Sequence, residues 1–553
     1  MNTVKNIILT GAVIMLSLTS CSWSLDLDPS TKFDANTVFS SESSVDHYLY
    51  GLYAYLKNNV ESYNSNAATY TDAYADLLKS GSWNQYGQGY NQVNQQESSF
   101  DSNSAGCFEC WTGCYTEIRC VNEFIRDLSQ TYADRFSASF ISTRCAEARF
   151  VRDFAYWQLL RVYGRCILRT KVEGPEGNDK PLSSPAECWQ FLIDDLKLSA
   201  ADIPVSAIET GRLDKKAVFG FLSRIALYAE QWQEAVNAAD SCKKYGGALL
   251  DNYASVFAES NAHNNENLIT IDFTKDGVVS HRADVFFRPS GDSKYHGDIS
   301  VYGELCPTAE MADEYENADS TPFDWDTQNT DPYTGREPRF YASILYNDAP
   351  WEGRRIQVYK VDADGNPGED ARQDYRQTSG TTSTPTGYYF RKFITENDTN
   401  WETKGSSHFG IHLRYAEVLL NKAEALANLN DLPAAAAPLN EVRARVGLLP
   451  RATTDKDEFM KWIRHERMVE LAGEGLRYWD LRRWRLAETV LGGALMHGVD
   501  VTVNTDGSFT YKRIEVDAGV PRIFHERYYA FAIPLSERTN NNAIDINDNN
   551  PEW

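Results

Sequence analysis

The pattern of hydrophobic and polar positions predicts helices over much of the chain. Apolar residues, many of them alanine, recur at three- and four-residue steps in residues 214–229 and 231–244, and again in 412–428 and 432–446. This spacing places them on one face of a helix. Within each set a short connection joins the two stretches. We therefore expect two helical pairs, in which small side chains let the helices approach closely.

Capping residues mark several other helices. Ser184 precedes a proline at the start of one apolar stretch, Ser44 precedes another, and Gly164 follows a third. Serine is favoured just before the first turn of a helix, and glycine just after the last. Capping and periodicity together predict helices at residues 45–58, 71–78, 111–128, 143–163 and 185–201.

Residues 459–484 are predicted to form one long, charge-laced helix. Apolar positions recur there at helical spacing, and opposite charges lie about one turn apart at three places: Arg467 with Glu470, Glu474 with Arg477, and Arg477 with Asp480. Pairs at this spacing support a helix by about 0.2–0.5 kcal/mol each. With so many arginine–carboxylate pairs beside tryptophans, we expect a partly buried scaffold helix whose charges satisfy one another.

Residues 251–410 show no sustained helical period. They contain polar loops and short β-like runs at 268–273 and 285–287, and a polar hairpin is predicted later, within residues 490–517 around Gly507. The fold class is therefore mostly α. Helical pairs that resemble tetratricopeptide units form a scaffold, and an irregular, loop-rich region carries short β-strands.

The N-terminus has the features of an export signal. Lys5 precedes an apolar run at residues 7–18, which is too short to anchor stably in a bilayer, and L-T-S-C ends at Cys21. This end resembles a bacterial lipobox, in which the cysteine receives a lipid; the alternative is an ordinary secretory signal. The predicted divisions are a signal peptide at 1–20, a lipid-anchored tether at 21–44 and a single domain at 45–553. The domain consists of a helical scaffold (45–250 and 411–490), a loop-rich insertion (251–410) and a C-terminal segment (491–553).

Composition narrows the class of ligand. The 553-residue chain has a formal net charge of −24, which argues against binding nucleic-acid phosphates. Aromatic residues make up 12% of the chain, and several lie in polar loops, where the alternative is that they pack back onto the body. Exposed rings stack on sugar rings, and amide groups bond to hydroxyls. The candidate ligand-binding residues are Trp83, Asn84, Tyr86, Tyr295, Tyr302 and Trp325.

Sequence signatures of catalysis are missing. The chain has no G-x-S-x-G, no H-E-x-x-H and no phosphate-binding loop. Cys107, Cys110, Cys114 and Cys120 are compatible with a zinc site, a disulfide or buried thiols. His408 and His412 have a ligand-like spacing, but an incidental position at a helix start is the favoured interpretation. We predict no enzyme activity, no cofactor and no metal.

Several motifs resemble the SusD/RagB family of outer-membrane lipoproteins. The pattern I-R-x-E-R-x-x-E-L-x-x-E-G-x-R-x-x-D-L-x-R-W covers residues 463–484, and weaker matches occur at 147–164, 306–316, 337–353, 439–448 and 528–553. In the segment at 337–353, Glu337 stands where the family usually has Asp.

The resemblance implies a lipid-anchored protein at the outer surface of the outer membrane. Such a protein binds an oligosaccharide, polysaccharide or other nutrient and passes it, uncleaved, to a partner SusC-like, TonB-dependent β-barrel transporter. The alternatives are a surface glycoside hydrolase, a scaffold that binds a protein partner, and a binder of a non-glycan nutrient such as peptide.

Overall fold

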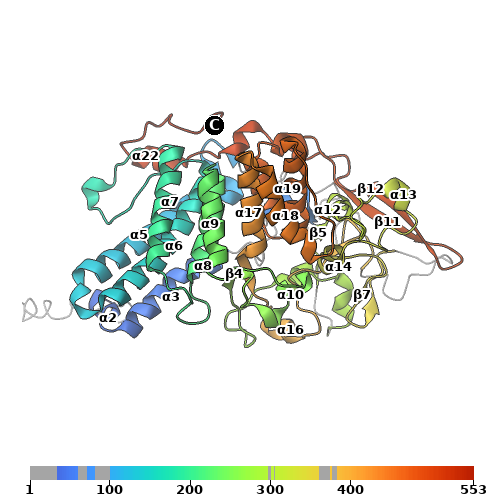
Figure 1. The fold of residues 1–553 in the computed structure, drawn as a ribbon, viewed down its shortest axis with the longest axis horizontal. Coiled ribbons are helices and arrows are strands. Elements are labelled where there is room, and N and C mark those ends of the chain that lie inside the picture. The colour runs from blue at the N-terminus through green and yellow to red at the C-terminus, as the bar shows by residue number, and fades with distance from the viewer. Residues whose placement is uncertain are drawn as a thin grey trace, which may run out of the picture.

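The computed structural model describes residues 34–59, 71–80, 100–296, 301–303, 305–359, 374–376 and 383–553. Helices fill one side of the molecule, and a loop-rich region with short strands fills the other (Figure 1). The predicted mostly α fold is confirmed for these residues. Within them, no helix has both the length and the apolar character needed to cross a bilayer.

The N-terminal half is built around one buried helix. This helix, α6 (Ala138–Tyr163), packs against three neighbours: α3 (Glu42–Asn58), α5 (Trp111–Arg126) and α7 (Pro185–Asp202). Gly164 ends α6 at a φ of 72°, and Ser184 caps α7 through a reciprocal bond with Glu187, as predicted. A short helix, α2 (Ala35–Val38), and the first residues of α3 fall in the stretch 21–44.

Two details of the N-terminal prediction are wrong. The cap of α3 is Ser41, whose Oγ accepts a bond from the Ser44 backbone N–H at 3.2 Å. The helix expected at 71–78 is a single 3₁₀ turn, η3 (Thr71–Tyr74), followed by strand β1 (Leu78–Ser80). Strand β1 pairs antiparallel with β5 (Leu305–Pro307), so a partner distant in sequence overrides the local helical pattern.

The two predicted helical pairs are confirmed. They are α8 (Lys215–Tyr228) with α9 (Trp232–Lys244), and α17 (Tyr415–Asn428) with α18 (Leu432–Arg445); α17 also packs on both α8 and α9. Close packing depends on small residues, since a Cβ on Gly220 would lie 2.8 Å from Leu268. The helix expected from His412 begins later, because residues Gly410–Arg414 form strand β10, which pairs with β4 (Asn267–Ile271).

The single long helix predicted at 459–484 is wrong. The chain forms α19 (Lys456–Glu470), then a break, then α20 (Arg477–Arg483), followed by α21 (Ala487–Leu491). The break contains Gly473 and Gly475, at φ 76° and 73°, in the left-handed region that favours glycine. It lets the Gly475 N–H donate to Asp72 Oδ2 at 3.0 Å.

The charges of this segment make tertiary ion pairs in place of the predicted local ones. Arg467 pairs with Asp480 at 2.8 Å, Glu470 with Arg414 at 2.6 Å, and Arg477 with Asp76 at 2.8 Å. Glu470 also binds Arg339 at 2.9 Å, which reaches it from the loop-rich region on α14 (Pro338–Ser343). The buried network thus joins the helical scaffold to the loop-rich region.

The rest of the chain consists of short elements. The segment expected as a strand at 285–287 belongs to helix α11 (Ala283–Phe287), whereas the hairpin predicted within 490–517 is confirmed as β11 (His497–Val503) and β12 (Phe509–Glu515). The other named elements are α10 (Tyr253–Val256), η10 (Ser290–Lys294), α12 (Ala309–Glu314), α13 (Trp325–Gln328), α16 (Asn400–Lys404), α22 (Leu535–Asn540), β2 (Phe100–Asp101), β3 (Ser104–Ala105), β6 (Ile344–Leu345), β7 (Pro350–Trp351), β8 (Arg354–Arg355) and β9 (Tyr389–Phe390).

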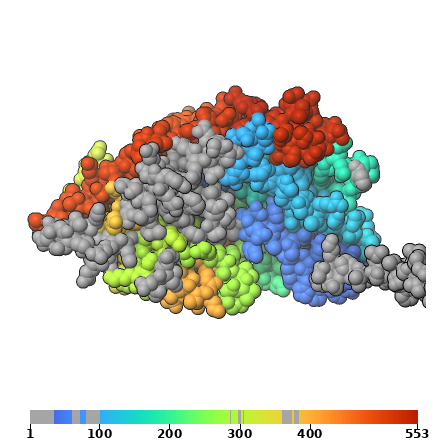
Figure 2. All heavy atoms as spheres, turned by 180° about the vertical axis from the view of Figure 1, so that it is seen from behind, coloured from blue at the N-terminus to red at the C-terminus, as the bar shows by residue number. Residues whose placement is uncertain are grey.

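The C-terminal residues run from the loop-rich region to the N-terminal helices and contact the latter. Figure 2 shows them, in orange and red, along the upper edge of the molecule from the hairpin at one end to the N-terminal helices at the other. Phe531 N donates to the Val162 carbonyl at 3.0 Å, and Arg165 pairs with Asp548 at 2.7 Å. These contacts fasten the chain end to the C-terminal end of α6.

Candidate functional site

Three of the six candidate ligand-binding residues lie in the described part of the chain. Tyr295 follows the turn η10 and is 48% exposed, which makes it one of the most exposed large aromatic side chains described. Tyr302 and Trp325 are half-buried. Trp83, Asn84 and Tyr86 lie outside the described residues, as does the predicted lipidation residue, Cys21.

Tyr295 and Tyr302 belong to one local structure. Ser293 Oγ accepts a bond from the Val301 backbone N–H at 3.1 Å, and Tyr302 N donates to the Val285 carbonyl at 2.9 Å. Trp325 starts α13, where its ring meets Phe323 at a centroid distance of 6.0 Å. In Figure 1, α13 lies apart from α16, the helix to which the Tyr295 turn is tied. The hydrogen bonds therefore tie the turn of Tyr295 to the segment of Tyr302, whereas Trp325 lies elsewhere.

Strand pairing places Ser80 near the segment that carries Tyr302. In the β1–β5 pair, Ser80 lies opposite Leu305, three residues after Tyr302. The chain that continues toward Trp83 therefore leaves the described part beside the segment that carries Tyr302. Strand β1 is held in place by a buried ion pair, in which the Lys79 ammonium lies 2.6 Å from Asp517 Oδ1.

Two cations flank the exposed ring of Tyr295. The Arg354 guanidinium carbon lies 5.2 Å from the ring centroid, and the Lys294 ammonium lies 5.5 Å from it. Both distances allow a cation–π attraction. Arg354 is itself held by carboxylates on its other side, with Asp292 at 2.8 Å and a short bond to Asp374. The ring is thus presented on a turn whose neighbours are fixed.

Arg288 lies beneath this turn and is completely buried. Its side chain bonds to Asp292 at 2.9 Å, to the Thr395 carbonyl at 2.5 Å and to Glu352 through a short contact. The guanidinium carbon lies 5.1 Å from the ring centroid of Trp351 and 4.7 Å from that of Trp401. A planar cation between two aromatic rings, with carboxylates at its edges, is a rigid arrangement.

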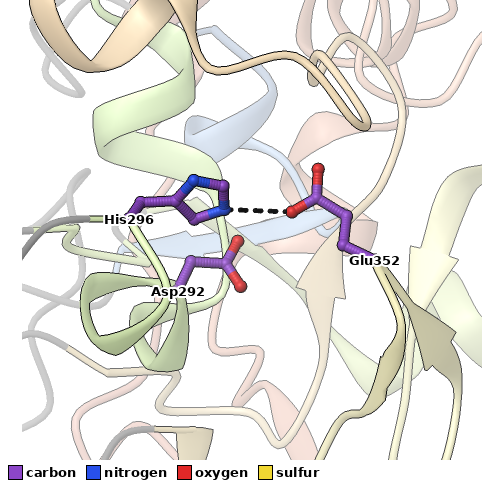
Figure 3. Close-up of side chains that lie close together, drawn as sticks. All are labelled: Asp292, His296 and Glu352. Carbon is purple, nitrogen blue, oxygen red and sulfur yellow. Dashed lines mark hydrogen bonds and ion pairs between the residues drawn. The ribbon is translucent and has the colours of Figure 1, made fainter.

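His296 completes what we call the ion-pair frame, which consists of Arg288, Asp292, His296, Glu352, Arg354 and Glu402. The His296 Nε2 lies 3.1 Å from Glu352 Oε2 (Figure 3), and its Nδ1 lies 2.6 Å from Glu402 Oε1 on α16. Burial by itself would raise the pKa of Glu352, but the charge and bonds of Arg288 hold it below its usual value. The frame thus ties the turn to α16 and to the β7–β8 hairpin.

This cluster has the residue types of a metal site. Asp292, His296 and Glu352 each offer one ligand atom, and these atoms lie within 4.8 Å of one another. Both Asp292 oxygens already accept bonds from Trp351 Nε1, at 3.1 and 3.0 Å, and further bonds from Arg288 and Arg354. Glu352 accepts from Arg288 and from the Asn397 backbone N–H. A metal ion would have to displace guanidinium groups, so the donor set fits an ion-pair frame and does not fit a metal.

The other ligand-like residues hold the fold together. His408 Nε2 faces the Phe257 carbonyl at 2.8 Å, and His412 Nε2 faces the Leu56 carbonyl at 2.8 Å. Cys107 and the eight cysteines that follow it form no disulfide in the described structure, and no described group of potential metal ligands includes a cysteine. The zinc interpretation of the Cys107–Cys120 segment is therefore unsupported in the described residues.

The surface has two hollows beside the ion-pair frame and a larger one away from it. One of about 530 Å³ is lined by the β7–β8 hairpin, and another of about 700 Å³ shares Arg391, Glu396 and Asn397 with it. A larger hollow, of about 1060 Å³, lies between α3, residues 205–214 and β4, and contains none of the predicted residues. In sequence, Arg288, Asp292 and His296 follow one another at four-residue steps, but Glu352, Arg354 and Glu402 lie far along the chain, so no single local pattern marked the frame as a group.

The fold and site define a class of helical scaffold proteins that present aromatic side chains on a rigid, loop-rich face. Comparison with known families makes the assignment specific. The family model described as "SusD family" matches residues 265–553, slightly over half of the chain, and one described as "Starch-binding associating with outer membrane" matches residues 25–227. The protein belongs to the SusD family, as its motifs predicted.

Individual relatives agree with this assignment. SusD-like protein P25 of Formosa agariphila is 24% identical over 507 residues, which cover 87% of this chain and 90% of the relative. A crystal structure of a SusD-like protein from Bacteroides fragilis has a TM-score of 0.76 at 26% identity and covers 94% of this chain and 99% of its own. A SusD-like carbohydrate binding protein from the same species has a TM-score of 0.74 at 24% identity, with coverages of 91% and 99%.

Proposed function

We propose that this protein captures an oligosaccharide at the cell surface without cleaving it. The observation that carries the proposal is Tyr295, an aromatic ring 48% exposed on a turn that buried ion pairs hold in place. Rings held in this way stack on the C–H faces of sugars at little entropic cost. The description of one matching family as starch-binding, and the carbohydrate-binding relative of similar fold, support the same ligand class.

We further propose that Trp83, Asn84, Tyr86 and Tyr302 contribute to the same surface as Tyr295. The pairing of Ser80 with Leu305 supports this grouping, because it places the base of the segment that leads to Trp83 next to the segment of Tyr302. Trp325, on α13, would then contact only the far end of a long polymer. The single domain at 45–553 is part of the same proposal.

The proposed place of action is the outer membrane, with Cys21 as the lipid anchor and a TonB-dependent transporter as the partner that receives the ligand. The family description that mentions association with the outer membrane supports this location. Extraction with a gentle detergent should copurify a large β-barrel protein with the native protein. Recovery of the protein without any such barrel would argue against the transporter partner.

The binding test compares two exposed tyrosines. Tyr295→Ala should weaken binding to a responsive oligosaccharide by about 1 kcal/mol, or roughly fivefold in Kd, as measured by calorimetry over a panel of starch-type and β-glucan oligosaccharides. Tyr48→Ala, on α3, is the matched control, because Tyr48 is 37% exposed and lies in the N-terminal helices.

Equal affinity of Tyr295→Ala and the wild type for a proven ligand would remove Tyr295 from the site. A separate incubation of the wild type with labelled oligosaccharide tests for cleavage. Released fragments would favour a glycoside hydrolase over a binding protein.

A further inference from the structure

Two buried cysteines approach one another at the connection between α6 and α7. The Sγ atoms of Cys166 and Cys188 lie 3.6 Å apart, and the two residues are 0% and 1% exposed. A disulfide needs the sulfurs about 2.05 Å apart, so the pair must close by about 1.5 Å.

The backbone around both residues is already fixed. Cys166 O accepts a bond from the Ser183 N–H at 2.8 Å, which draws the two ends of the connection together. Ile167 N donates to the Tyr115 hydroxyl at 2.7 Å, and Cys188 N donates to the Ser184 carbonyl at 3.0 Å. The two thiols are therefore neighbours because of the fold itself.

In the folded protein the two thiols differ in acidity. The hydrogen bond from Cys166 lowers the pKa of Cys188 despite burial, and Cys188 lies at the N-terminal end of α7, where partial positive charge favours a thiolate. Burial raises the pKa of Cys166. Burial likewise raises the pKa of Cys107 and Cys145 to about 11, and that of Cys242 to about 12.

We propose that Cys166 and Cys188 form a disulfide as the exported protein folds in an oxidising compartment. The Cys188 thiolate attacks an external disulfide, either a small molecule or a protein oxidant, and displaces one thiolate. Cys166 then loses its proton and attacks the Cys188 sulfur of this mixed disulfide, releasing the second thiol. Two cysteine thiols are oxidised, and one external disulfide is reduced to two thiols. Because the pair is buried in the folded protein, exchange takes place before α7 docks on α6.

The crosslink would close a loop that supports the C-terminal segment. Within this loop, Lys180 exchanges two bonds with Asn541, at 3.2 and 2.8 Å, and Asp179 accepts a bond from the Asn542 side chain at 2.8 Å. The disulfide therefore braces the connection on which the end of α22 rests. The inference depends on the proposed location outside the cytoplasm but not on any ligand.

The test is a thiol count on the full-length protein, exported to a bacterial periplasm and purified without reductant. Under denaturing conditions, N-ethylmaleimide should label seven of the nine cysteines that follow Cys21, and all nine after reduction. Peptide mass spectrometry should find Cys166 linked to Cys188. Labelling of both residues before reduction, or a link to any other cysteine, would overturn the proposal.

Thermal unfolding gives a second measurement. Reduction should lower the wild-type Tm by roughly 2–4 °C, the range expected for opening a loop of this size in a large chain. The Cys166→Ala/Cys188→Ala variant should start at the lower Tm and not respond to reductant, whereas the control Cys242→Ala should respond as the wild type does. If the double variant does not fold, the thiol count on the wild type still decides. If the protein contains the disulfide but binds no glycan, the proposed function is refuted and the disulfide proposal stands.

Discussion

Replacing Arg288 with methionine tests whether the ion-pair frame holds the Tyr295 turn. Methionine keeps much of the side-chain volume but removes the cation between Trp351 and Trp401. Three carboxylates then lose a bond: the buried Asp292 at 2.9 Å, the buried Asp284 at 3.4 Å, and the half-buried Glu352 through its short contact.

The expected cost is large because the charges left behind stay buried. Removing one partner of a buried pair typically costs about 3–5 kcal/mol of unfolding free energy. Arg355→Met, on the β7–β8 hairpin whose turn carries Glu352, is the matched control. Its side chain is 60% exposed and faces Asp348 at 3.5 Å, so its loss should cost about 0–1 kcal/mol.

The two variants are compared by urea unfolding followed through tryptophan fluorescence, and by hydrogen exchange at residues 288–296. Arg288→Met should show the larger free-energy loss and faster exchange in this segment. Its deficit should shrink as the pH falls toward 5, because carboxylates left without a cation have raised folded-state pKa values and are stable when protonated. An Arg288→Met protein within 1 kcal/mol of the control, with unchanged exchange, would refute the role assigned to the frame.

Three further predictions concern titration and packing. Burial lowers the pKa of His412 from 6.5 to about 4, so the wild type should lose stability as the pH falls from 6.5 to 4. The variant His412→Gln keeps a donor for the Leu56 carbonyl, and its Tm should depend less on pH over this range in thermal melts. Burial raises the pKa of Glu117 from 4.5 to about 7, so ionisation of this carboxyl above pH 7 destabilises the folded state. Glu117→Gln should therefore raise the Tm at pH 8 but not at pH 4. Gly473→Ala would place a Cβ 2.1 Å from Phe390 Cζ at a φ of 76°, and should lower the Tm.

Controls separate these effects from general damage. His47→Gln, at an exposed position, should leave the loss of stability between pH 6.5 and 4 unchanged. Gly507→Ala adds a Cβ that meets no other group within 4 Å, so it measures the cost of a positive φ without a steric clash. A wild-type acid slope in His412→Gln would count against its buried neutral state. The same holds for Glu117 if the Glu117→Gln effect does not depend on pH. Equal Tm values for the two glycine variants would contradict the clash at Phe390.

The sequence by itself determined the helical scaffold, because the period of an amphipathic helix and its caps are local properties. The two helical pairs, the cap at Ser184 and the glycine at the end of α6 were all predicted from neighbouring residues. The family motifs were also readable without coordinates, and the family is confirmed.

Tertiary structure decided the partners of the charged and aromatic residues. Arg467, Glu470 and Arg477 looked like intrahelical pairs, but two glycines break the helix and the charges reach distant partners. Tyr295 was recognisable as an aromatic residue in a polar loop, yet the carboxylates that bind Arg288 and His296 and so hold its turn, Glu352 and Glu402, lie far along the chain. Ion pairs between segments far apart in sequence depend on how the whole chain packs, and no local period encodes that packing.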